Sequence, residues 1–295
     1  MKIAAIQVSG ATGDGRARKK VEQYLEAAHA RGARIACLPE LACHPWFPRD
    51  PTTDLAAVAE PADGPAARWA MDTARRIGIA VVLPFCERAL EGVYHNSALV
   101  VDARGEPVGV YRKVHLPDIP FWAERRLFAP GDLGFPVFTV EGMRLGIQLG
   151  WDHFFPEGFR CLALAGAQVV FVPTAAAFAS QERWLAMGVS HAIANGMYVV
   201  RVNRVGSEPG LDFYGHSFVV RPDGDLAAEP LGMAEGVLLA EIDPAAVEWV
   251  RRTWPFLADR RPRQYAAVAG VGWPRDPGTL PEGSGDGPVG GDDDA

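Results

Sequence analysis

The chain has 295 residues, of which 48% are hydrophobic and 22% charged, a profile typical of a globular protein with one large core. The formal net charge is -7, but six acidic residues lie in the last twenty positions, so the rest is nearly neutral and offers no basic surface for nucleic acid. No apolar run approaches the roughly 18 residues that cross a bilayer, and the first residues resemble a strand rather than a signal peptide. We therefore expect a cytoplasmic protein with reduced thiols that binds neither nucleic acid nor a membrane.

The first third of the chain alternates strands and helices. Residues 3–8 predict a buried strand, and residues 16–31 predict an amphipathic helix that Gly32 ends. A short apolar strand follows at residues 34–39, where Pro39 breaks it and places Glu40 just past its end. A strand end is where a polar side chain can face a cleft.

Glycine and hydrophobic periodicity also mark the next elements. We predict, in order, a helix over 66–77 ended by Gly78, a strand over 79–85, and two strands over 95–102 and 107–112 joined by a turn at Arg104-Gly105. Helices packed on the faces of a mixed sheet give a layered α/β or α+β body.

Residues 144–160 predict an elbow between a strand and a helix. Leu145, Ile147 and Leu149 alternate as in a strand, which stops at Gly150 and turns through Trp151-Asp152 into a helix after Pro156. Hydrolases of several folds hold a nucleophile at such an elbow. In this chain glycine occupies that position, so the elbow has no nucleophilic side chain.

The last part of the chain continues the pattern and then loses it. After Gly166 we predict strands at 168–172, 198–203, 215–221 and 236–242 and helices at 181–195 and 244–252. Residues 269–295 are rich in Gly, Pro and Asp without periodicity. We therefore predict one domain over residues 1–268, followed by a disordered acidic tail.

Several separated blocks resemble the nitrilase superfamily, the carbon–nitrogen hydrolases. They are Leu38-Pro39-Glu40, Tyr111-Arg-Lys113-Val-His-Leu-Pro, Trp122-Ala-Glu124-Arg with Phe128-Ala-Pro-Gly131-Asp, the elbow itself, Val172-Pro-Thr174-Ala175, His191-Ala-Ile-Ala-Asn195-Gly, Val202-Asn-Arg-Val-Gly206, and Gly215-His-Ser217 with Pro222-Asp-Gly224. The resemblance covers about residues 1–265 and is closest in wording to amidases that cleave N-carbamoyl groups. It implies a four-layer αββα sandwich, a small-molecule substrate, no cofactor, and assembly into a homodimer or higher homo-oligomer.

The resemblance also assigns expected roles to individual residues. Glu40 matches the general base, Lys113 the catalytic lysine, and Glu124 a second glutamate that positions the lysine and substrate. Opening an amide, ureide or nitrile needs a nucleophile, a base, and donors for the charge that develops on oxygen or nitrogen. Lys113 and backbone N–H groups near Trp151 would supply those donors. The family's nucleophilic cysteine stands immediately before the Trp-Asp pair, where this chain has Gly150.

Other residues are candidates for binding the substrate or replacing the nucleophile. We expect Trp46, Trp151, Asp152, His153 and Thr174 to contact the substrate, with a structural role as the alternative for His153 and a role in the core as the alternative for Trp46. Among the cysteines, only Cys43 is near enough to Glu40 in sequence to reach the cleft, whereas Cys161 is expected to be a small buried hydrophobic residue. No histidine or cysteine spacing predicts a metal site.

Three functional hypotheses follow. The first, which we favour, is an enzyme that acts on a small C–N compound without a covalent thioester, through a water activated by Glu40 in the room left by Gly150, or through cyclisation or dehydration. The second is an inactive relative that binds such a ligand or a protein partner. The third is deliberate replacement of the nucleophile to trap a ligand. Ordinary cysteine-dependent amidase activity is expected to be weak or absent in all three, because glycine cannot form the thioester.

Overall fold

The structure is a computed structural model that describes residues 1–10, 16–177 and 180–270. The chain divides into two compact units, Met1–Leu257 and Ala258–Ala295. In the second unit, a 3-10 helix (Pro262–Tyr265) leads into α7 (Ala266–Gly270), and the Tyr265 hydroxyl accepts a hydrogen bond from the Arg261 amide at 2.9 Å. The predicted disordered tail lies almost wholly outside the described residues, and the predicted domain boundary at residue 268 stays a prediction.

The first unit is built on two β-sheets. The six-stranded sheet has the order β13 (Gly236–Glu241), β1 (Lys2–Gln7), β2 (Ala33–Cys37), β3 (Ala80–Leu90), β4 (Val93–Val101) and β5 (Pro107–Arg112). The five-stranded sheet has the order β12 (Phe218–Val220), β9 (Tyr198–Asn203), β8 (Val169–Thr174), β7 (Met143–Ile147) and β6 (Phe138–Val140). A separate hairpin pairs β10 (Val205–Glu208) with β11 (Leu211–Tyr214).

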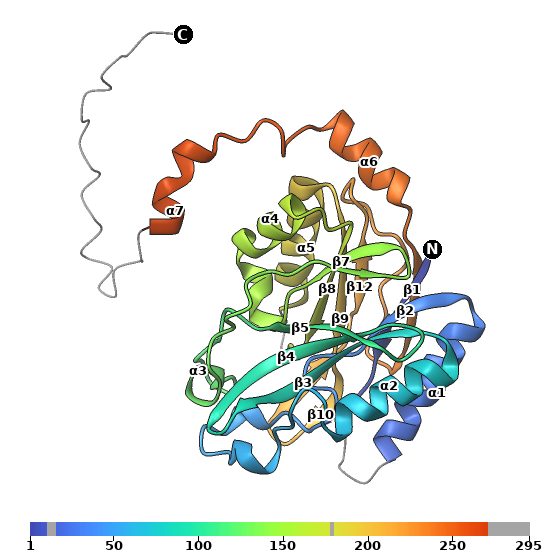
Figure 1. The fold of residues 1–295 in the computed structure, drawn as a ribbon, viewed down its shortest axis with the longest axis vertical. Coiled ribbons are helices and arrows are strands. Elements are labelled where there is room, and N and C mark those ends of the chain that lie inside the picture. Colours follow the sequence, from blue (N-terminus) through green and yellow to red (C-terminus); the bar gives the residue numbers. More distant parts are fainter. Residues whose placement is uncertain (11–15, 178–179, 271–295) are drawn as a thin grey trace. The chain divides into compact units, whose positions relative to one another are not determined.

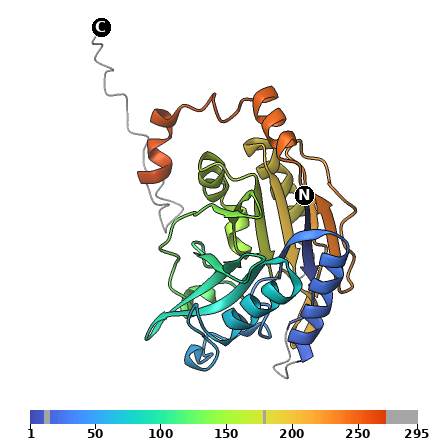
Figure 2. The ribbon, with the colours of Figure 1, turned by 45° about the vertical axis from the view of Figure 1, so that its right-hand side comes forward.

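Helices cover the outer faces of both sheets, so the first unit has four layers. Helices α1 (Arg16–Ala30) and α2 (Pro65–Ile77) pack on the six-stranded sheet, and α4 (Pro156–Leu164) and α5 (Gln181–Asn195) pack on the five-stranded sheet (Figure 1). The same layers can be followed from a second direction in Figure 2, with α6 (Pro244–Thr253) near the ends of the strands. The predicted αββα sandwich is therefore confirmed.

Three apolar clusters hold these layers together. One lies between the two sheets and joins residues such as Ile35 and Val82 to Leu145 and Phe171. The second lies under α1 and α2, and the third under α4 and α5. Strands buried on both faces explain the near-continuous apolar runs of the sequence. None of the helices in the described part of the chain is long and apolar enough to cross a membrane.

Most helices end just before the glycines that predicted their ends. Gly78 and Gly196 follow α2 and α5 with φ angles of 81° and 57°, a left-handed conformation that a side chain would oppose. The β6–β7 and β10–β11 hairpins were not predicted. In the β6–β7 hairpin, Glu141 and Gly142 have φ angles of 50° and 78°, which is the pattern of a type I′ turn between strands too short to show periodicity.

The expectation for Cys161 is wrong, because its side chain is exposed rather than buried. On α4, Phe159, Leu162 and Ala163 face the core under the helix. A residue between those positions points away from the core, since successive helical residues are turned by about 100°. Helical phase, rather than the small size of the side chain, decides where Cys161 lies.

Candidate active site

The elbow is a short 3-10 turn, Gly150–Phe154, between β7 and α4. Asp152 is fully buried and fixes the turn, because its carboxylate accepts hydrogen bonds from the Leu149 amide at 3.0 Å and the Tyr111 hydroxyl at 2.7 Å. The His115 amide donates to the same carboxylate at 2.8 Å, and the His115 ring stacks on Phe155 with centroids 3.7 Å apart. Tyr111 in β5 and His115 after β5 thus hold the elbow that follows β7 in the other sheet.

Glu40, Lys113 and Glu124 form one buried cluster next to this elbow. Glu40 follows β2, Lys113 follows β5, and Glu124 begins the short helix α3 (Glu124–Leu127). The Lys113 ammonium donates to Glu40 Oε1 at 2.7 Å and to both oxygens of Glu124 at 2.8 and 2.7 Å. None of the three side chains is more than 2% exposed. Desolvated charges of this kind are destabilising unless they are paired and hydrogen-bonded, as they are here.

Asn96 on β4 belongs to the same cluster and was missed in the sequence analysis. Its Nδ2 donates to Glu40 Oε1 at 2.8 Å and to Glu124 Oε2 at 3.1 Å, while its backbone carbonyl accepts from the Lys113 backbone amide at 2.8 Å. One amide group therefore bridges the two carboxylates. The signal was present in the sequence, because His95-Asn96-Ser97 places three consecutive polar residues in an otherwise apolar strand, and all three are buried.

The cluster contains two carboxylates and one ammonium, and its pKa shifts reflect that imbalance. Burial alone would lower the pKa of Lys113, but the adjacent Glu124 and Glu40 carboxylates outweigh burial and raise it above its usual value. Burial, together with the charge of Glu40, raises the pKa of Glu124 to about 7 in spite of the ammonium beside it. Lys113 is therefore a permanent cation, and Glu124 can bind a proton near neutral pH.

Glu40 occupies the space beside Gly150. A Cβ atom placed on Gly150 would lie 2.4 Å from Oε2 and 2.8 Å from Oε1 of Glu40, and the φ angle of Gly150 is +43°. Oε2 also accepts a hydrogen bond from the Ala175 amide at 3.2 Å. The carboxylate of the expected base thus fills the position of a Cβ, while Gly150 itself still lines the cavity, and the expectation that the glycine leaves room for a water stays a prediction.

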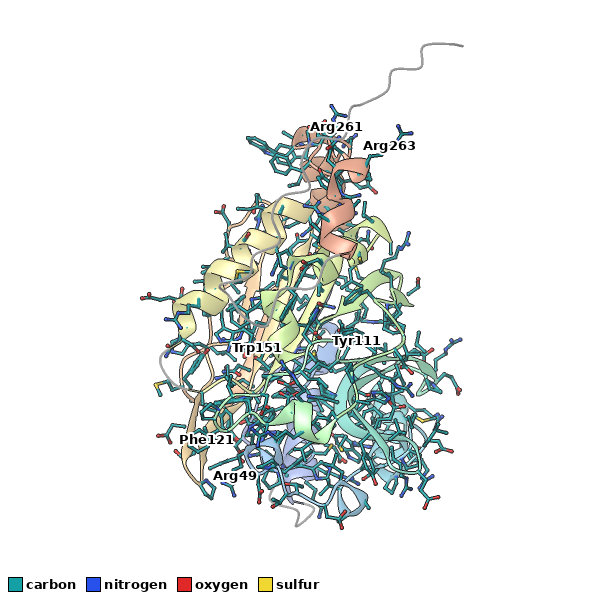
Figure 3. The ribbon with its side chains drawn as sticks, turned by 90° about the vertical axis from the view of Figure 1, so that its left-hand side faces the viewer. Arg49, Tyr111, Phe121, Trp151, Arg261 and Arg263 are labelled. Atoms are coloured by element: carbon teal, nitrogen blue, oxygen red, sulfur yellow. The ribbon has the colours of Figure 1, made fainter. Side chains whose placement is uncertain are left out.

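A cavity of about 410 Å³ opens over the cluster. Its lining consists of Glu40, Lys113, Pro117, Ile119, Trp122, Glu124, Gly150, Trp151, Phe154, Ala175, Ala176, Ala177, Ser180, Arg183 and Trp184. In Figure 3 the labelled Tyr111 belongs to β5 of the six-stranded sheet, and the labelled Trp151 belongs to the elbow after β7 of the five-stranded sheet. The Trp151 amide makes no hydrogen bond to another described residue, which leaves it available to a ligand. The structure thus brings Glu40, Lys113, Glu124, Gly150 and Trp151 together around one cavity.

Four of the predicted substrate-binding residues lie behind the cavity lining rather than in it. Trp46 is fully buried, with its ring 6.3 Å from that of Trp122 and its Nε1 donating to the Phe121 carbonyl at 2.9 Å. Asp152 holds the elbow, as described above. Trp46 is excluded from the cavity because Trp122, a residue on a different loop, packs in front of it.

His153 and Thr174 have structural contacts as well. His153 is buried, stacks on Trp184 with centroids 5.2 Å apart, and binds the Trp184 carbonyl through Nε2 at 2.9 Å. The Thr174 hydroxyl donates to Asn203 Oδ1 at 3.0 Å inside the second sheet. Both residues therefore support the wall of the cavity. The residues of its outer part, Ser180, Arg183 and Trp184, were missed because helix 181–195 gave no polar pattern that pointed to a cleft.

None of the four cysteines lies at the elbow position that the family resemblance gives to the nucleophile. All four cysteines are in the described residues, and none lines the cavity. Cys43 packs against the core under α1 and α2, and burial raises the pKa of its thiol to about 11. A thiol with so high a pKa is a poor nucleophile at neutral pH. Among the described residues, no group of three His, Cys, Asp or Glu side chains is arranged to hold a metal ion.

The family comparison agrees with this geometry. The family model described as carbon-nitrogen hydrolase matches residues 2–252, which is most of the chain. The chain belongs to the carbon-nitrogen hydrolase family. The N-carbamoylputrescine amidase of Arabidopsis thaliana is 34% identical over 263 residues, a match that covers 84% of this chain and 88% of that protein. The resemblance stated from the sequence is therefore confirmed.

Solved structures of the family share the fold. A carbon-nitrogen hydrolase from Helicobacter pylori is 31% identical and superposes with a TM-score of 0.87, covering 91% of this chain and 98% of that chain. A mutant of the amidase from Nesterenkonia sp. is 29% identical with a TM-score of 0.77, covering 90% of this chain and 98% of that chain. That structure shows Michael addition of acrylamide at the active site cysteine of the amidase.

Proposed function

We propose that this protein acts on a small amide, carbamoyl or nitrile compound without forming a covalent thioester. The observation that carries the proposal is the intact buried cluster of Glu40, Lys113 and Glu124 beside a glycine at the elbow. Burying two carboxylates and an ammonium costs folding free energy, so a pocket that catalyses no reaction has no physical reason to keep them. The family membership supports the class of bond, because the named relatives act on carbon–nitrogen compounds.

Glu40 is suited to the role of general base. Its Oε1 is bound by Lys113 and Asn96, whereas Oε2 accepts only the weaker bond from the Ala175 amide. We assign Oε2 to a water in the cavity that Glu40 and Gly150 both line. Glu40 takes a proton from this water as its oxygen attacks the carbonyl carbon, and returns the proton to the leaving amine. Atoms then balance as amide plus water giving acid plus amine.

Lys113 and the Trp151 amide are suited to stabilising the oxygen of the tetrahedral intermediate. The ammonium has three N–H donors, which bind Glu40 Oε1 and both oxygens of Glu124, so one donor turns to a ligand when Glu124 keeps a single bond to Lys113. Preorganised donors in a site that excludes water contribute the largest share of catalysis in many hydrolases. In a serine protease, loss of the nucleophile lowers turnover by roughly 10⁶, while the remaining site keeps about 10³–10⁴ over water. We expect slow turnover of that order.

Ligand binding without turnover is the second candidate function. One observation favours it. The Glu40 carboxylate occupies the position that a Cβ on Gly150 would take, so a base in this place is held away from a water beside the elbow. The ligand in this case is the same kind of small C–N compound, and a protein partner remains an alternative. The position of the cluster inside a cavity of about 410 Å³ supports a small molecule over a protein surface.

The two candidates are separated by product analysis. The protein is incubated with a panel of amides, ureides and nitriles in water labelled with ¹⁸O, and products are measured by mass spectrometry. For an amide substrate, turnover predicts one labelled oxygen in the acid product, and for every substrate it predicts loss of product formation in Glu40→Gln. Binding with no product, shown by a thermal shift in the same samples, would replace the enzyme proposal with the binding one. Neither product nor binding would contradict both. Comparison with the natural gene sequence tests whether Gly150 was introduced deliberately.

A further inference from the structure

The turn that follows Glu40 has a strained backbone. Leu41 is fully buried and has a φ angle of 48°, a left-handed conformation that a bulky side chain opposes. The His44 amide donates to the Leu41 carbonyl at 3.1 Å and closes the turn. A strained conformation of this kind persists only where the surrounding contacts hold it in place. Because Leu41 follows Glu40 directly, the contacts that hold this turn also decide where the Glu40 carboxylate lies.

One arginine from a distant part of the chain supplies those contacts. Arg204 lies in the link between β9 and β10, and its Nη2 donates to the carbonyls of Glu40 at 3.0 Å and Leu41 at 2.9 Å. Both Nη1 and Nη2 donate to the His44 carbonyl at 3.0 Å. The planar fork of a guanidinium can therefore bind three carbonyls of one turn at the same time, whereas a lysine would offer a single point charge.

Glu208 in β10 holds this guanidinium in place. Arg204 Nη1 donates to Glu208 Oε1 at 2.6 Å, and Glu208 Oε2 accepts from the Trp46 amide at 2.6 Å. The backbone of Arg204 is also held, because its amide donates to the Thr174 carbonyl at 3.0 Å. The arginine and the glutamate neutralise each other, so their effect on Glu40 is mainly one of position.

The packing around the ion pair leaves it little freedom. The guanidinium carbon of Arg204 lies 5.7 Å from the ring centre of Trp46 and 5.5 Å from that of Phe213. Gly10 also packs against the pair, because a Cβ on Gly10 would overlap Arg204 Nη1 and lie 2.6 Å from Glu208 Oε1. Neither Arg204 nor Glu208 lines the cavity, so neither contacts a ligand bound there.

We propose that Arg204 is a positioning residue for Glu40, which it holds from outside the cavity through the backbone of the turn. Its bonds to the three carbonyls keep the turn left-handed and the Glu40 carboxylate where a Cβ on Gly150 would lie. Glu208 in turn keeps the guanidinium aimed at the turn. The catalytic consequence rests on the proposed function, in which Glu40 is the general base, whereas the position of Glu40 can be tested without a substrate.

A double-mutant cycle between Arg204 and Gly150 is that test. The two residues share Glu40, because Arg204 binds its carbonyl and a Cβ at position 150 would press on its carboxylate. Gly150→Ala should therefore lower Tm less in Arg204→Lys, where the turn can give way, than in the unaltered chain. We expect the fall in Tm caused by Gly150→Ala to shrink by about 2 °C or more.

Arg201→Lys is the matched control for this cycle. Arg201 is also a fully buried arginine, in β9, but it donates to the Tyr214 oxygen and the His216 carbonyl rather than to the turn after Glu40. Arg201→Lys should lower Tm by itself, and its effect should add to that of Gly150→Ala.

Glu208→Gln is a second variant for the cycle, in case Arg204→Lys does not fold. It keeps Arg204 and all its carbonyl bonds but replaces the charged partner that holds the guanidinium. We expect the fall in Tm caused by Gly150→Ala to shrink in this variant too, by less than in Arg204→Lys.

A compound that gives product in the panel described above allows a second measurement. Arg204→Lys should lower kcat by about tenfold to a hundredfold, because the base is displaced, and should leave KM nearly unchanged, because Lys113 and the cavity lining stay in place. A raised KM with an unchanged kcat would refute the positioning of the base.

The outcomes separate this inference from the proposed function. A shrunken fall in Tm in the Arg204 or Glu208 cycle, with additive falls in the Arg201 cycle, supports the positioning role. Additive falls in all the cycles would refute it, even if product forms. Equal shrinkage with Arg201→Lys would assign the effect to the loss of any buried arginine and would refute it as well. If the expected coupling is found but no compound is turned over, the positioning role stands and the proposed catalysis is refuted.

Discussion

Introducing a cysteine at position 150 tests whether the active site lies at this elbow. In Gly150→Cys, the new Cβ meets Glu40 Oε2 at 2.4 Å on a backbone with φ of +43°. A side chain in the left-handed region costs about 1–2 kcal/mol. Moving Glu40 away from Lys113, Asn96 and the Ala175 amide adds about 1–3 kcal/mol, because these bonds are buried and partly charged.

The sum predicts a less stable but folded protein. A loss of about 2–5 kcal/mol corresponds to a fall in Tm of roughly 5–15 °C for a body of this size. Gly150→Ala is the matched control, because alanine adds the same Cβ without a thiol. Equal falls in Tm for the two variants would assign the loss to the Cβ. No fall in Tm for either variant would show that Glu40 does not press on the elbow.

The thiol itself reports whether the elbow is the catalytic position. With Glu40 as the base that takes its proton and Lys113 as the cation that stabilises the thiolate, the new thiol should react faster with iodoacetamide near neutral pH than the native cysteines. We further expect measurable amidase or carbamoylase activity in Gly150→Cys and none from a thiol in Gly150→Ala. Rapid alkylation without cleavage of any amide, ureide or nitrile would show that the pocket differs from the family's in more than its nucleophile. A folded variant with an unreactive cysteine would refute the placement of the active site at this elbow.

Three further predictions follow from the cluster and the family. Lys113→Ala should abolish the thermal shift given by a urea or amide ligand, whereas an equal shift in both proteins would place binding elsewhere. Because Glu124 has a raised pKa of about 7 in the folded state, the folded protein binds more protons than the unfolded chain between pH 4.5 and 7, so stability falls as pH rises through this range. Glu124→Gln should flatten that slope in denaturant titrations, and an unchanged slope would assign it to other groups. The family resemblance predicts a homodimer or larger homo-oligomer, and a monomer in light scattering at micromolar concentration would contradict it.

Local signals were sufficient to predict the framework around the site. Gly78 and Gly196 mark helix ends because glycine alone adopts a left-handed backbone without a Cβ penalty. Pro39 and Gly150 mark the strand ends from which the cleft is built. The convergence of Glu40, Lys113 and Glu124 was predicted from the family resemblance, since their separation in sequence carries no spacing that would reveal it.

Which residues line the cavity depends on tertiary packing, which the sequence alone does not show. Trp46 and Trp122 both lie in loops near the site, yet only Trp122 lines the cavity, because the two rings pack one behind the other. The contact of Glu40 with Gly150 depends on the conformation of a buried side chain rather than on any motif. Ser180 and Arg183 became visible only when the start of α5 was found at the mouth of the cavity.

The hydrogen bonds of Asp152 have a mechanical consequence. They fasten the elbow after β7 to Tyr111 and His115, which lie two residues before and two residues after Lys113 at the end of β5. Small sliding motions of one sheet over the other therefore carry Lys113 and Gly150 together. The distance between the Lys113 ammonium and Gly150 should therefore change little when the sheets move. The Leu149 amide, which is bonded to Asp152, should be among the slowest amides of the protein to exchange hydrogen for deuterium.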